Sequence, residues 1–437
     1  MKNLRGKRLL ILGGTRWINA IADFAGENGV EVFAASNDPK AKFFEIAKES
    51  FLISSTDAEA MKKLIREKKI DGVHVGSHEV VLKSACKYLH ESGLPCYCTE
   101  EQLNVLHNKE NFKNACMSVG LPVVPRIEID EDNLKGTSEN LKYPVIVKPV
   151  DSSAARGVSL CKNVGEFLTA CEEARNFSPT RKILVEKFMN NSGVYLHYTF
   201  SEGKAYFCGL SEKYPVQYKK HGSWVQGIHI FQSADIEHFR KCFEEKLLNL
   251  FDKLQMREGN IWFELFRDDE KYYFNECAYR YAGSQFMYPI NYFYGINQVY
   301  SDLYYSLTGE SCLRGHTSLI PDSVPKKSFY AIYPIHLKPG KISAVKGIDE
   351  FKKRENVVLI AEERFVGMNI EDSGTGRQIF ATVHFVFDSR DELINMVNDI
   401  HEKIVVEDEH GENLSNKMLD MENVSADFFS RHRKEVK

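Results

Sequence analysis

The first hundred residues alternate between short apolar runs and longer amphipathic stretches, and this alternation limits the folds open to the chain. Apolar runs lie at 8–13, 30–35, 71–75 and 95–98, and helical spacing fills 17–28, 57–69 and 80–92. A strand that is apolar along its whole length is buried on both faces, as in a parallel sheet covered by helices. Repeated strand–helix–strand units therefore predict an α/β domain with a doubly wound parallel sheet over residues 1–107.

The pattern changes at about residue 108. Short strands are expected at 143–148, 182–186, 194–200, 204–210, 260–264 and 271–275, with helices at 109–120, 164–175 and 236–254. This mixture is typical of an α+β region. From 326 to 437 the expected strands are shorter and interrupted by glycines, with one helix at 390–403. We therefore divide the chain into three parts, 1–107, 108–325 and 326–437.

The composition excludes two classes of partner. The chain has 437 residues, a net charge of −4 and a pI of about 6.4. Nucleic-acid binders usually carry a basic domain or stripe, so no nucleic-acid partner is expected. The apolar run behind the basic N-terminus, Leu9 to Leu12, is too short for a signal peptide or a membrane helix. We expect a cytoplasmic protein without a membrane partner.

The ten cysteines are scattered along the chain. Their closest pair, Cys96 and Cys98, lacks the two-residue spacing of a redox or zinc motif, and no second pair follows to complete a four-ligand set. We therefore expect reduced thiols.

A glycine pair follows the first apolar run, where a dinucleotide-binding fingerprint would lie. The sequence there is Gly13-Gly14-Thr15-Arg16-Trp17, so the full GxGxxG is absent. A tryptophan at the point where a tight turn should meet a pyrophosphate argues against NAD binding and against a dehydrogenase. The pair is expected to form a tight turn.

Two glutamates, Glu264 and Glu276, end neighbouring apolar runs, and the polar stretch 267–270 between the runs predicts a hairpin. The hairpin would bring both carboxylates to one end, where they repel each other unless a cation lies between them. Oxygen ligands beside nucleotide phosphates are how proteins usually hold Mg²⁺. Arg280, a few residues beyond, could meet a phosphoryl oxygen. A surface hairpin with solvated acids is the alternative.

A lysine, Lys148, ends another apolar strand, and its ammonium could reach a phosphate. The loop that follows, 151–158, is rich in small residues, whose backbone N–H groups can approach an anion closely. The strand ending at Glu186 runs into a connector whose backbone could read an adenine edge.

Together these motifs resemble the ATP-grasp superfamily, in particular its biotin carboxylase-like, carbamoyl-phosphate-synthase-like and L-amino-acid ligase types. The matching segments are Asn108–Phe112, Gly120–Pro125, Tyr143–Pro149, the loop to Val158, Val185–Phe188, Glu264 and Glu276-x-x-x-Arg280. With the flanking regions, the resemblance covers nearly the whole chain. It implies a pre-ATP-grasp domain at 1–107, an ATP-grasp domain at 108–325 with a mobile subdomain at about 120–190, and an α+β domain at 326–437.

The resemblance also implies a role for each matched residue. ATP would be bound by Lys109, Lys148, Ser152, Ser153, Gly157, Glu186, Lys187, Phe188, Met189 and Tyr195. Within this set the two lysines would contact the phosphates, the loop would close over them, and Glu186 to Met189 would hold adenine. Glu264 and Glu276 would bind Mg²⁺, and Arg280, with Lys148, would act on the transferred phosphoryl group.

The sequence departs from the family pattern at three places. Ala278 replaces the asparagine of the usual Glu-x-Asn-x-Arg, Ala154 and Ala155 stand where the phosphate loop often has glycines, and Tyr195 lies where an acidic residue often binds ribose. One metal ligand is therefore lost or supplied from elsewhere, with Asn275 or water as replacements.

The implied reaction is carboxylate–amine ligation. ATP would phosphorylate a small-molecule carboxylate, and a nucleophile such as an amino acid would attack the acyl phosphate, releasing ADP and phosphate. The segments 211–222, a polar and aromatic loop, and 279–285 lie where such ligases take their second substrate, although the loop could equally be a surface connection. Two alternatives stay open, a bicarbonate-phosphorylating carboxylase or carbamoyl-phosphate-type enzyme and a weakly active nucleotide-binding protein. A homodimer also stays open.

Overall fold

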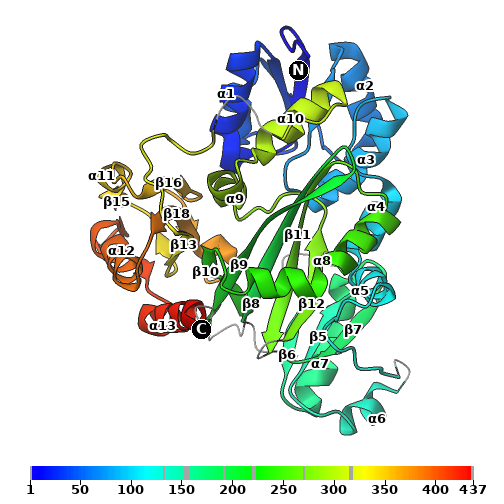
Figure 1. Ribbon diagram of the computed structural model, residues 1–437, viewed down its shortest axis with the longest axis vertical. Coiled ribbons are helices and arrows are strands. Elements are labelled where there is room, and N and C mark those ends of the chain that lie inside the picture. The colour runs from blue at the N-terminus through cyan, green and yellow to red at the C-terminus, as the bar shows by residue number, and fades with distance from the viewer. Residues whose placement is uncertain are drawn as a thin grey trace.

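The structure is a computed structural model. It describes residues 2–130, 133–151, 157–189, 192–218, 223–268, 271–313 and 318–434. Figure 1 shows a large central sheet with an N-terminal lobe at one end, a small lobe of strands and helices at the other, and the C-terminal region beside it. Within the described ranges, no helix combines the length and the apolar character needed to cross a bilayer.

The N-terminal lobe contains a four-stranded parallel sheet. In spatial order its strands are β3 (Glu49–Leu52), β2 (Glu31–Ser36), β1 (Arg8–Ile11) and β4 (Gly72–His74). The helices that follow the strands are α1 (Ile18–Asn28), α2 (Ala58–Lys68) and α3 (Glu79–Glu91), with short 3-10 turns η1 (Thr15–Trp17) and η2 (Lys42–Ile46). The parallel pairing of these strands confirms the predicted α/β sheet. Its central strands are apolar and buried, as the sequence indicated.

Two details of this sheet differ from the sequence expectation. Residues 95–98 form no strand, so β4 is an edge strand of the sheet, with α10 (Gln298–Thr308) packed closely against its Gly72. Pro95 lacks a backbone donor. The fourth strand is instead β3, whose side chains are mostly exposed. An edge strand of this kind shows little hydrophobic periodicity, so the sequence did not reveal it.

The glycine pair forms the expected tight turn after β1. Gly14 has φ 104°, a conformation that favours glycine, and the buried Trp17 follows in η1. The indole Nε1 of Trp17 donates to Nε2 of His74 at 3.1 Å, and its ring packs edge-on against Tyr281 at 5.0 Å. Trp17 therefore links the N-terminal lobe to the segment around Tyr281.

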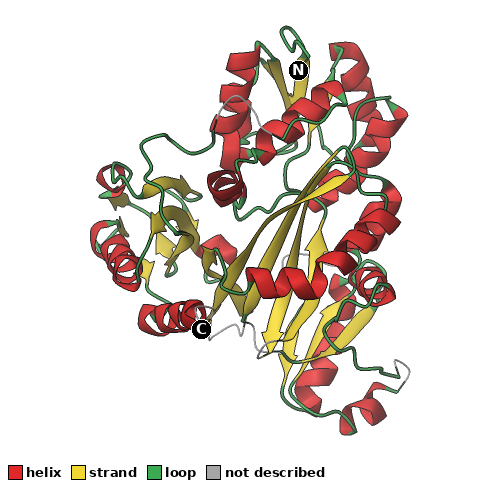
Figure 2. Cartoon of the chain, in the orientation of Figure 1, coloured by secondary structure: helices red, strands yellow, loops and turns green. Residues whose placement is uncertain are grey.

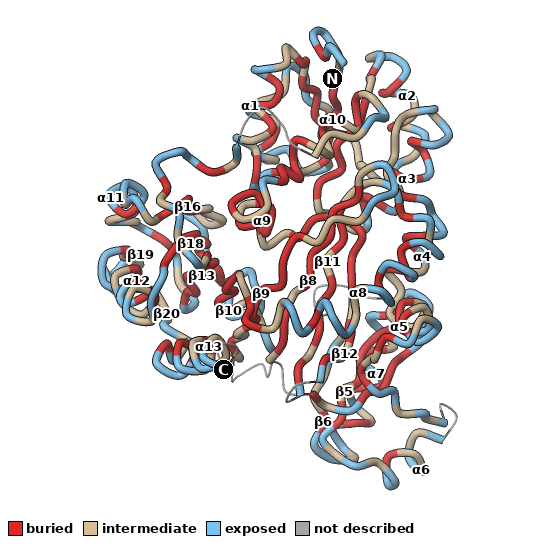
Figure 3. Tube along the Cα trace, in the orientation of Figure 1, coloured by how far each residue is buried: buried red, intermediate tan, exposed pale blue. Residues whose placement is uncertain are grey.

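The central sheet has nine strands, and neighbouring strands pair antiparallel. In spatial order they are β12 (Lys271–Ala278), β11 (Gly259–Asp268), β8 (Gly193–Ser201), β9 (Lys204–Tyr218), β10 (Ser223–Phe231), β13 (Phe329–Leu337), β18 (Ile379–Phe387) and β16 (Val357–Glu362), with β20 (Ser415–Asn416) on β13. Figure 3 shows that these strands are buried along most of their length.

The prediction of a loop at 211–222 is wrong for residues 211–218, which continue β9 and pair with β10. The strand carries the polar residues that suggested a loop, but several of them, including Ser211, Glu212 and Lys213, are buried among partners on neighbouring strands. Residues 219–222 lie outside the described residues.

The small lobe holds a three-stranded antiparallel sheet in the order β6 (Ser159–Cys161), β5 (Val145–Pro149) and β7 (Ile183–Lys187). Helices α6 (Leu134–Glu139) and α7 (Val164–Phe177) accompany it, as Figure 2 shows at the lower end of the molecule. The lobe has its own apolar core. It is therefore a separately packed layer facing the β11–β12 end of the central sheet.

The remaining helices connect or cover these sheets. They are α4 (Glu100–His107), α5 (Lys109–Ser118), α8 (Ile236–Lys253), α9 (Met287–Tyr294), α11 (Ile348–Phe351), α12 (Arg390–Lys403), α13 (Met421–Lys434) and the 3-10 turn η3 (Gly376–Gln378). The C-terminal region adds two small sheets, β14 (Gly340–Lys341) with β17 (Asn369–Ile370) and β15 (Ala344–Lys346) with β19 (Val405–Glu407). Because β13 pairs with β10, this region extends the central sheet.

Candidate active site

The two predicted metal-binding glutamates lie opposite each other on the paired strands β11 and β12. The register of the strand pairing shifts here. Glu264 lies opposite Glu276, whereas the next residue, Leu265, lies opposite Phe274. Asn275 is thus the extra residue of a β-bulge, a device that re-aims side chains next to functional sites. Its amide Nδ2 donates to Oε2 of Glu264 at 2.7 Å. The bulge therefore brings a third oxygen-bearing side chain to the carboxylates.

Glu264 is held by three donors. Besides Asn275, the ammonium of Lys213 lies 2.6 Å from its Oε1, and the hydroxyl of Tyr195 donates to the same oxygen at 3.1 Å. Tyr195 is directly opposite Glu264 on β8, which explains the contact. Burial raises the pKa of Glu264, but the charge of Lys213 and the three hydrogen bonds outweigh it, so the pKa lies below its usual value. Glu264 is therefore an ionised carboxylate inside the sheet.

Glu276 is the more accessible of the two carboxylates, with a side chain 37% exposed against 15% for Glu264. Its Oε2 lies 3.8 Å from the ammonium of Lys109, the first residue of α5. Glu264 is thus the more buried carboxylate, and Glu276 is the one that an incoming ligand can reach.

Lys148 links the small lobe to the acidic hairpin. From the buried strand β5, its Nζ donates to Oδ1 of Asn275 at 3.0 Å and lies 2.7 Å from Oε2 of Glu186 on β7. A second lysine, Lys113 on α5, contacts the other oxygen of Glu186. Burial, together with the charge of Lys109, lowers the pKa of Lys148 to about 7. An amine with this pKa gains a proton readily when an anion arrives.

The remaining predicted nucleotide contacts fall on or beside the small lobe. Ser152 and Ser153 lie outside the described residues. Gly157 has φ 72°, and a Cβ there would meet Phe177 at 3.0 Å and Pro149 at 3.2 Å, so both conformation and space favour glycine.

The residues predicted to hold adenine, 186–189, are the last two residues of β7 and the two that follow it. Glu186 points its carboxylate at the two lysines, Lys187 is exposed and donates its backbone N–H to the carbonyl of Pro125 at 3.0 Å, and Met189 is buried. Phe188 is half-buried between them.

Arg280 lies just past the end of β12 and makes a separate set of contacts. Its Nη2 is 3.7 Å from the carboxylate of Glu79 at the start of α3, and its guanidinium lies over the ring of Trp262 at 5.6 Å. Burial lowers the pKa of this guanidinium from its usual value. Its Nε is buried and has no hydrogen-bond partner among the described residues. Arg280 is therefore aligned by Glu79 and keeps a donor for a further acceptor.

Lys113, Lys213 and Glu79 had no predicted role of their own, although Lys213 lies in the segment 211–222 that was expected near the second substrate. A signal for Lys113 exists, because it lies one helical turn after Lys109 on the face of α5 that also buries Phe112. Lys213 and Glu79 had no local signal, since their partners lie far away in the sequence.

A cavity of about 660 Å³ lies elsewhere, between the first helix of the N-terminal lobe and the C-terminal region, with Arg16, Tyr300 and Phe365 among its lining residues. Its lining includes neither the two carboxylates nor the lysines described above. The catalytic candidates are therefore defined by the ionic network and not by this cavity.

Comparison with known proteins agrees with this arrangement. Residues 108–194 match the family described as carbamoyl-phosphate synthase L chain, ATP binding domain. Among curated proteins, the formate-dependent phosphoribosylglycinamide formyltransferase of Oleidesulfovibrio alaskensis is 28% identical over 187 residues, 42% of this chain and 47% of the relative. The matched region thus spans about half the length of the curated relatives.

Solved structures match over almost the whole chain. The biotin carboxylase domain of 2-oxoglutarate carboxylase from Hydrogenobacter thermophilus, solved with MgADP and bicarbonate, aligns with TM-score 0.73 and 16% identity, covering 97% of this chain and 95% of that one. The L-amino acid ligase of Bacillus licheniformis aligns with TM-score 0.72 and 18% identity, covering 92% and 98%. The resemblance inferred from the sequence is confirmed: the chain has the fold of the ATP-grasp ligases, and its residues 108–194 match an ATP-binding domain family.

Proposed function

We propose that the protein is an ATP- and Mg²⁺-dependent carboxylate–amine ligase that works through an acyl phosphate and releases ADP and phosphate. The observation that carries the proposal is the continuous chain of an ion pair and two hydrogen bonds from Glu186 through Lys148 and Asn275 to Glu264, which links the small lobe to the acidic hairpin. The ATP-binding family match over 108–194 supports the nucleotide. The triphosphate would lie between the two sheets.

The charges of this network suit a triphosphate. Three carboxylates, those of Glu186, Glu264 and Glu276, face the amines of four lysines among the described residues, Lys109, Lys113, Lys148 and Lys213. Burial lowers the pKa of Lys113 to about 5 and that of Lys148 to about 7, so these two amines would take up protons as an anion enters and would neutralise its charge. Lys109 and Lys148 would contact the phosphates.

The donor set of the hairpin fits Mg²⁺. Glu264, Glu276 and the amide oxygen of Asn275 are hard oxygen donors, the kind that Mg²⁺ accepts. Asn275 comes from the bulge and would supply the ligand that Ala278 cannot, through an Oδ1 that here accepts from Lys148. When bound, the ion would neutralise the charge that develops on the transferred phosphoryl group. Lys213 and Tyr195 would orient Glu264 toward it.

The reaction would proceed in two displacements. A carboxylate oxygen of the substrate attacks the γ-phosphorus, the bond to the β-phosphate oxygen breaks, and ADP leaves. The amine nitrogen then attacks the acyl carbon, phosphate leaves, and the amine loses a proton to solvent. Arg280, aligned by Glu79 with its Nε available, would hold the phosphoryl oxygens in both steps. Adenine would rest against residues 186–189.

The substrate class is a small carboxylic acid with an amine nucleophile. The similar fold of an L-amino acid ligase from Bacillus licheniformis supports amino acids as one or both substrates. Bicarbonate is the alternative acid, supported by the carboxylase of similar fold that was solved with that anion.

The test is a phosphate-release screen of carboxylates against amines with Mg²⁺ and ATP. We expect ADP release that needs both an acid and an amine, and its loss in Lys148→Ala and Glu276→Gln. Lys241→Ala and Glu237→Gln on the exposed side of α8 are matched controls and should keep the parent rate. Undiminished turnover in both site variants would reject the site, and bicarbonate-dependent ADP release without any amine would favour the carboxylase.

A further inference from the structure

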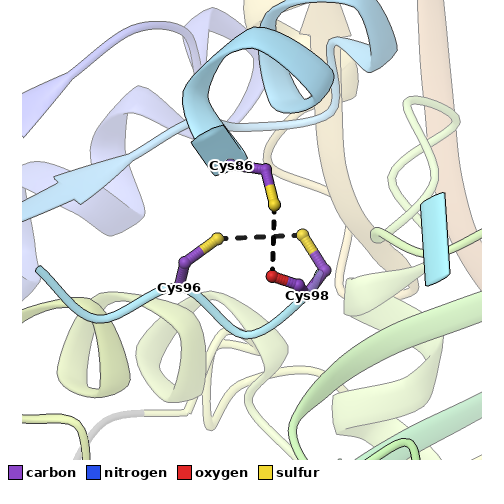
Figure 4. A group of neighbouring side chains, drawn as sticks. All are labelled: Cys86, Cys96 and Cys98. Carbon is purple, nitrogen blue, oxygen red and sulfur yellow. Dashed lines mark hydrogen bonds between the residues drawn. The ribbon is translucent and has the colours of Figure 1, made fainter. Parts of the chain in front are cut away.

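Three cysteines from two separate segments converge in the N-terminal lobe. Cys86 lies on α3, whereas Cys96 and Cys98 lie on the connector between α3 and α4. Figure 4 shows their side chains pointing toward a common centre. All three sulfur atoms lie within 4.8 Å of one another, and the Sγ atoms of Cys96 and Cys98 are 3.8 Å apart. No other group of three such ligands occurs among the described residues.

The connector bends at Tyr97 and forms no strand. The Sγ atoms of Cys96 and Cys98 lie together, while the intervening Tyr97 donates its hydroxyl to the carbonyl of Tyr279 at 3.1 Å. Cys86 contacts the carbonyl of Cys98 through its thiol at 3.2 Å. The backbone therefore fixes the three sulfurs together without any covalent link between them.

The spacing matches a metal site. With metal–sulfur bonds of about 2.3 Å, two sulfurs at the corners of a tetrahedron lie roughly 3.8 Å apart. Tightly packed thiols that serve only as small apolar groups need no shared centre. Three thiolates are soft ligands of the kind that select Zn²⁺ and related thiophilic ions over Mg²⁺.

The site is closed on one side and open on the other. Cys86 and Cys98 are buried, whereas Cys96 is half-buried and, with Cys98, lines a cavity of about 420 Å³. That cavity is also lined by Glu202, Glu258 and Glu310, together with Arg257. A water or another exogenous ligand would take the fourth corner of the tetrahedron.

We propose that Cys86, Cys96 and Cys98 form a binding site for one thiophilic divalent cation such as Zn²⁺. Binding forms three metal–sulfur bonds, breaks the three S–H bonds and releases three protons to solvent. The ion would tie α3 to the connector that leads into α4, and through Tyr97 it would brace the residue next to Arg280. Its role would be structural, because the Mg²⁺–ATP network uses other residues.

The test titrates Cd²⁺, and separately Zn²⁺, into the metal-free, reduced full chain carrying Cys242→Ser, which removes an exposed thiol. We expect one Cd²⁺ per chain, a thiolate-to-metal absorption band in the ultraviolet, three protons released and a higher melting temperature with either ion. In Cys96→Ser and Cys98→Ser the affinity should fall by at least about 100-fold, the upper end of the cost of losing an outer-shell partner. Cys312→Ser, at another half-buried thiol, should bind as the parent does.

Proton release and the absorption band in the parent do not depend on whether any variant folds. No band in the parent, or an equal band in a folded Cys96→Ser variant, would overturn the site. A disulfide between two of these cysteines in protein purified without reductant, with no bound ion, would also overturn it.

Discussion

Two buried ion pairs lie on opposite faces of the same strands, and only one of them belongs to the site. On one face Lys213 of β9 reaches Glu264 of β11 at 2.6 Å. On the other face the neighbouring Glu212 meets Arg267 at 2.8 Å, with Ser233 donating to the same carboxylate at 2.5 Å. The faces differ because adjacent residues of a strand point to opposite sides.

The two pairs differ in what surrounds them. Arg267 contacts Glu212 and Asp235, so that group is closed and more acidic than basic. The Glu264 pair instead continues through Asn275 to Lys148 and faces further ammonium groups. A buried pair whose partners are all in place is structural, whereas one that continues into a group of lysines can receive an anion. The comparison predicts that breaking the Arg267–Glu212 pair lowers stability, and that breaking the Lys213–Glu264 pair lowers turnover.

The largest expected effect is on stability. Arg267→Met leaves Glu212 as a buried, unpaired carboxylate, which should lower the free energy of unfolding by about 3–5 kcal/mol. Urea denaturation followed by circular dichroism measures it. Turnover per folded molecule should stay near the parent value, and a parent-like unfolding midpoint would show that Glu212 is not held by Arg267.

The next effect is on catalysis. Glu264→Gln removes a charge from the proposed Mg²⁺ site but keeps its shape, so kcat for ADP release should fall about 10²- to 10³-fold, the size typical of losing one electrostatic group. Steady-state ADP release measures it, and Glu237→Gln is the matched control on α8. The unfolding midpoint should move far less than in Arg267→Met. Equal loss of stability in both would erase the distinction between the two pairs.

A smaller effect concerns pH. The pKa of Lys148 is lowered to about 7 by burial and by the charge of Lys109, so the ammonium that would bind phosphate is lost as pH rises through 7. ATP affinity should therefore fall with increasing pH, by at most about tenfold per unit, as calorimetry can measure. Lys148→Arg keeps its charge and should flatten this dependence. A parent profile that is flat between pH 6 and 8, roughly one unit either side of that pKa, would contradict the assignment.

The lowered pKa of Lys148 also makes the free energy of unfolding depend on pH. An unfolded lysine holds its proton up to about pH 10.4, so between about 7 and 10.4 the unfolded chain binds more protons than the folded one. The contribution of Lys148 to the free energy of unfolding therefore rises with pH in that window. Comparing the parent with Lys148→Met by denaturation isolates it.

The smallest effect is expected at Tyr195. Tyr195→Phe removes one of three donors to Glu264 and leaves the ring packed, so the loss should be about 1 kcal/mol, or roughly fivefold in Mg²⁺ affinity. Metal titration of ADP release measures it. A loss as large as that of Glu264→Gln would mean that Tyr195 touches the reacting groups.

The sequence predicted the parts of the site that depend on short-range patterns. Glu264 and Glu276 lie on one hairpin, so their apposition follows from strand pairing alone, and Lys148 ends an apolar strand. The fold class followed from the alternation of apolar runs in the first hundred residues.

What the sequence could not supply depends on long-range contacts. Lys213 reaches Glu264 across an intervening strand, and the strand that carries it looks like a polar loop. The bulge at Asn275 is a register shift that no local propensity marks. Cys86 joins Cys96 and Cys98 only after the helix and the connector fold against each other. The spacing of Cys96 and Cys98 alone argued against any metal.

The central claim is that paired carboxylates of β11 and β12 and the lysine of β5 grip one metal–triphosphate. A crystal structure with Mn²⁺ and a non-hydrolysable ATP analogue tests it most directly, because Mn²⁺ is located by anomalous scattering. The account predicts an anomalous peak between the carboxylates of Glu264 and Glu276, with Lys148 on the phosphates. A peak elsewhere, or a nucleotide bound away from this hairpin, would contradict it.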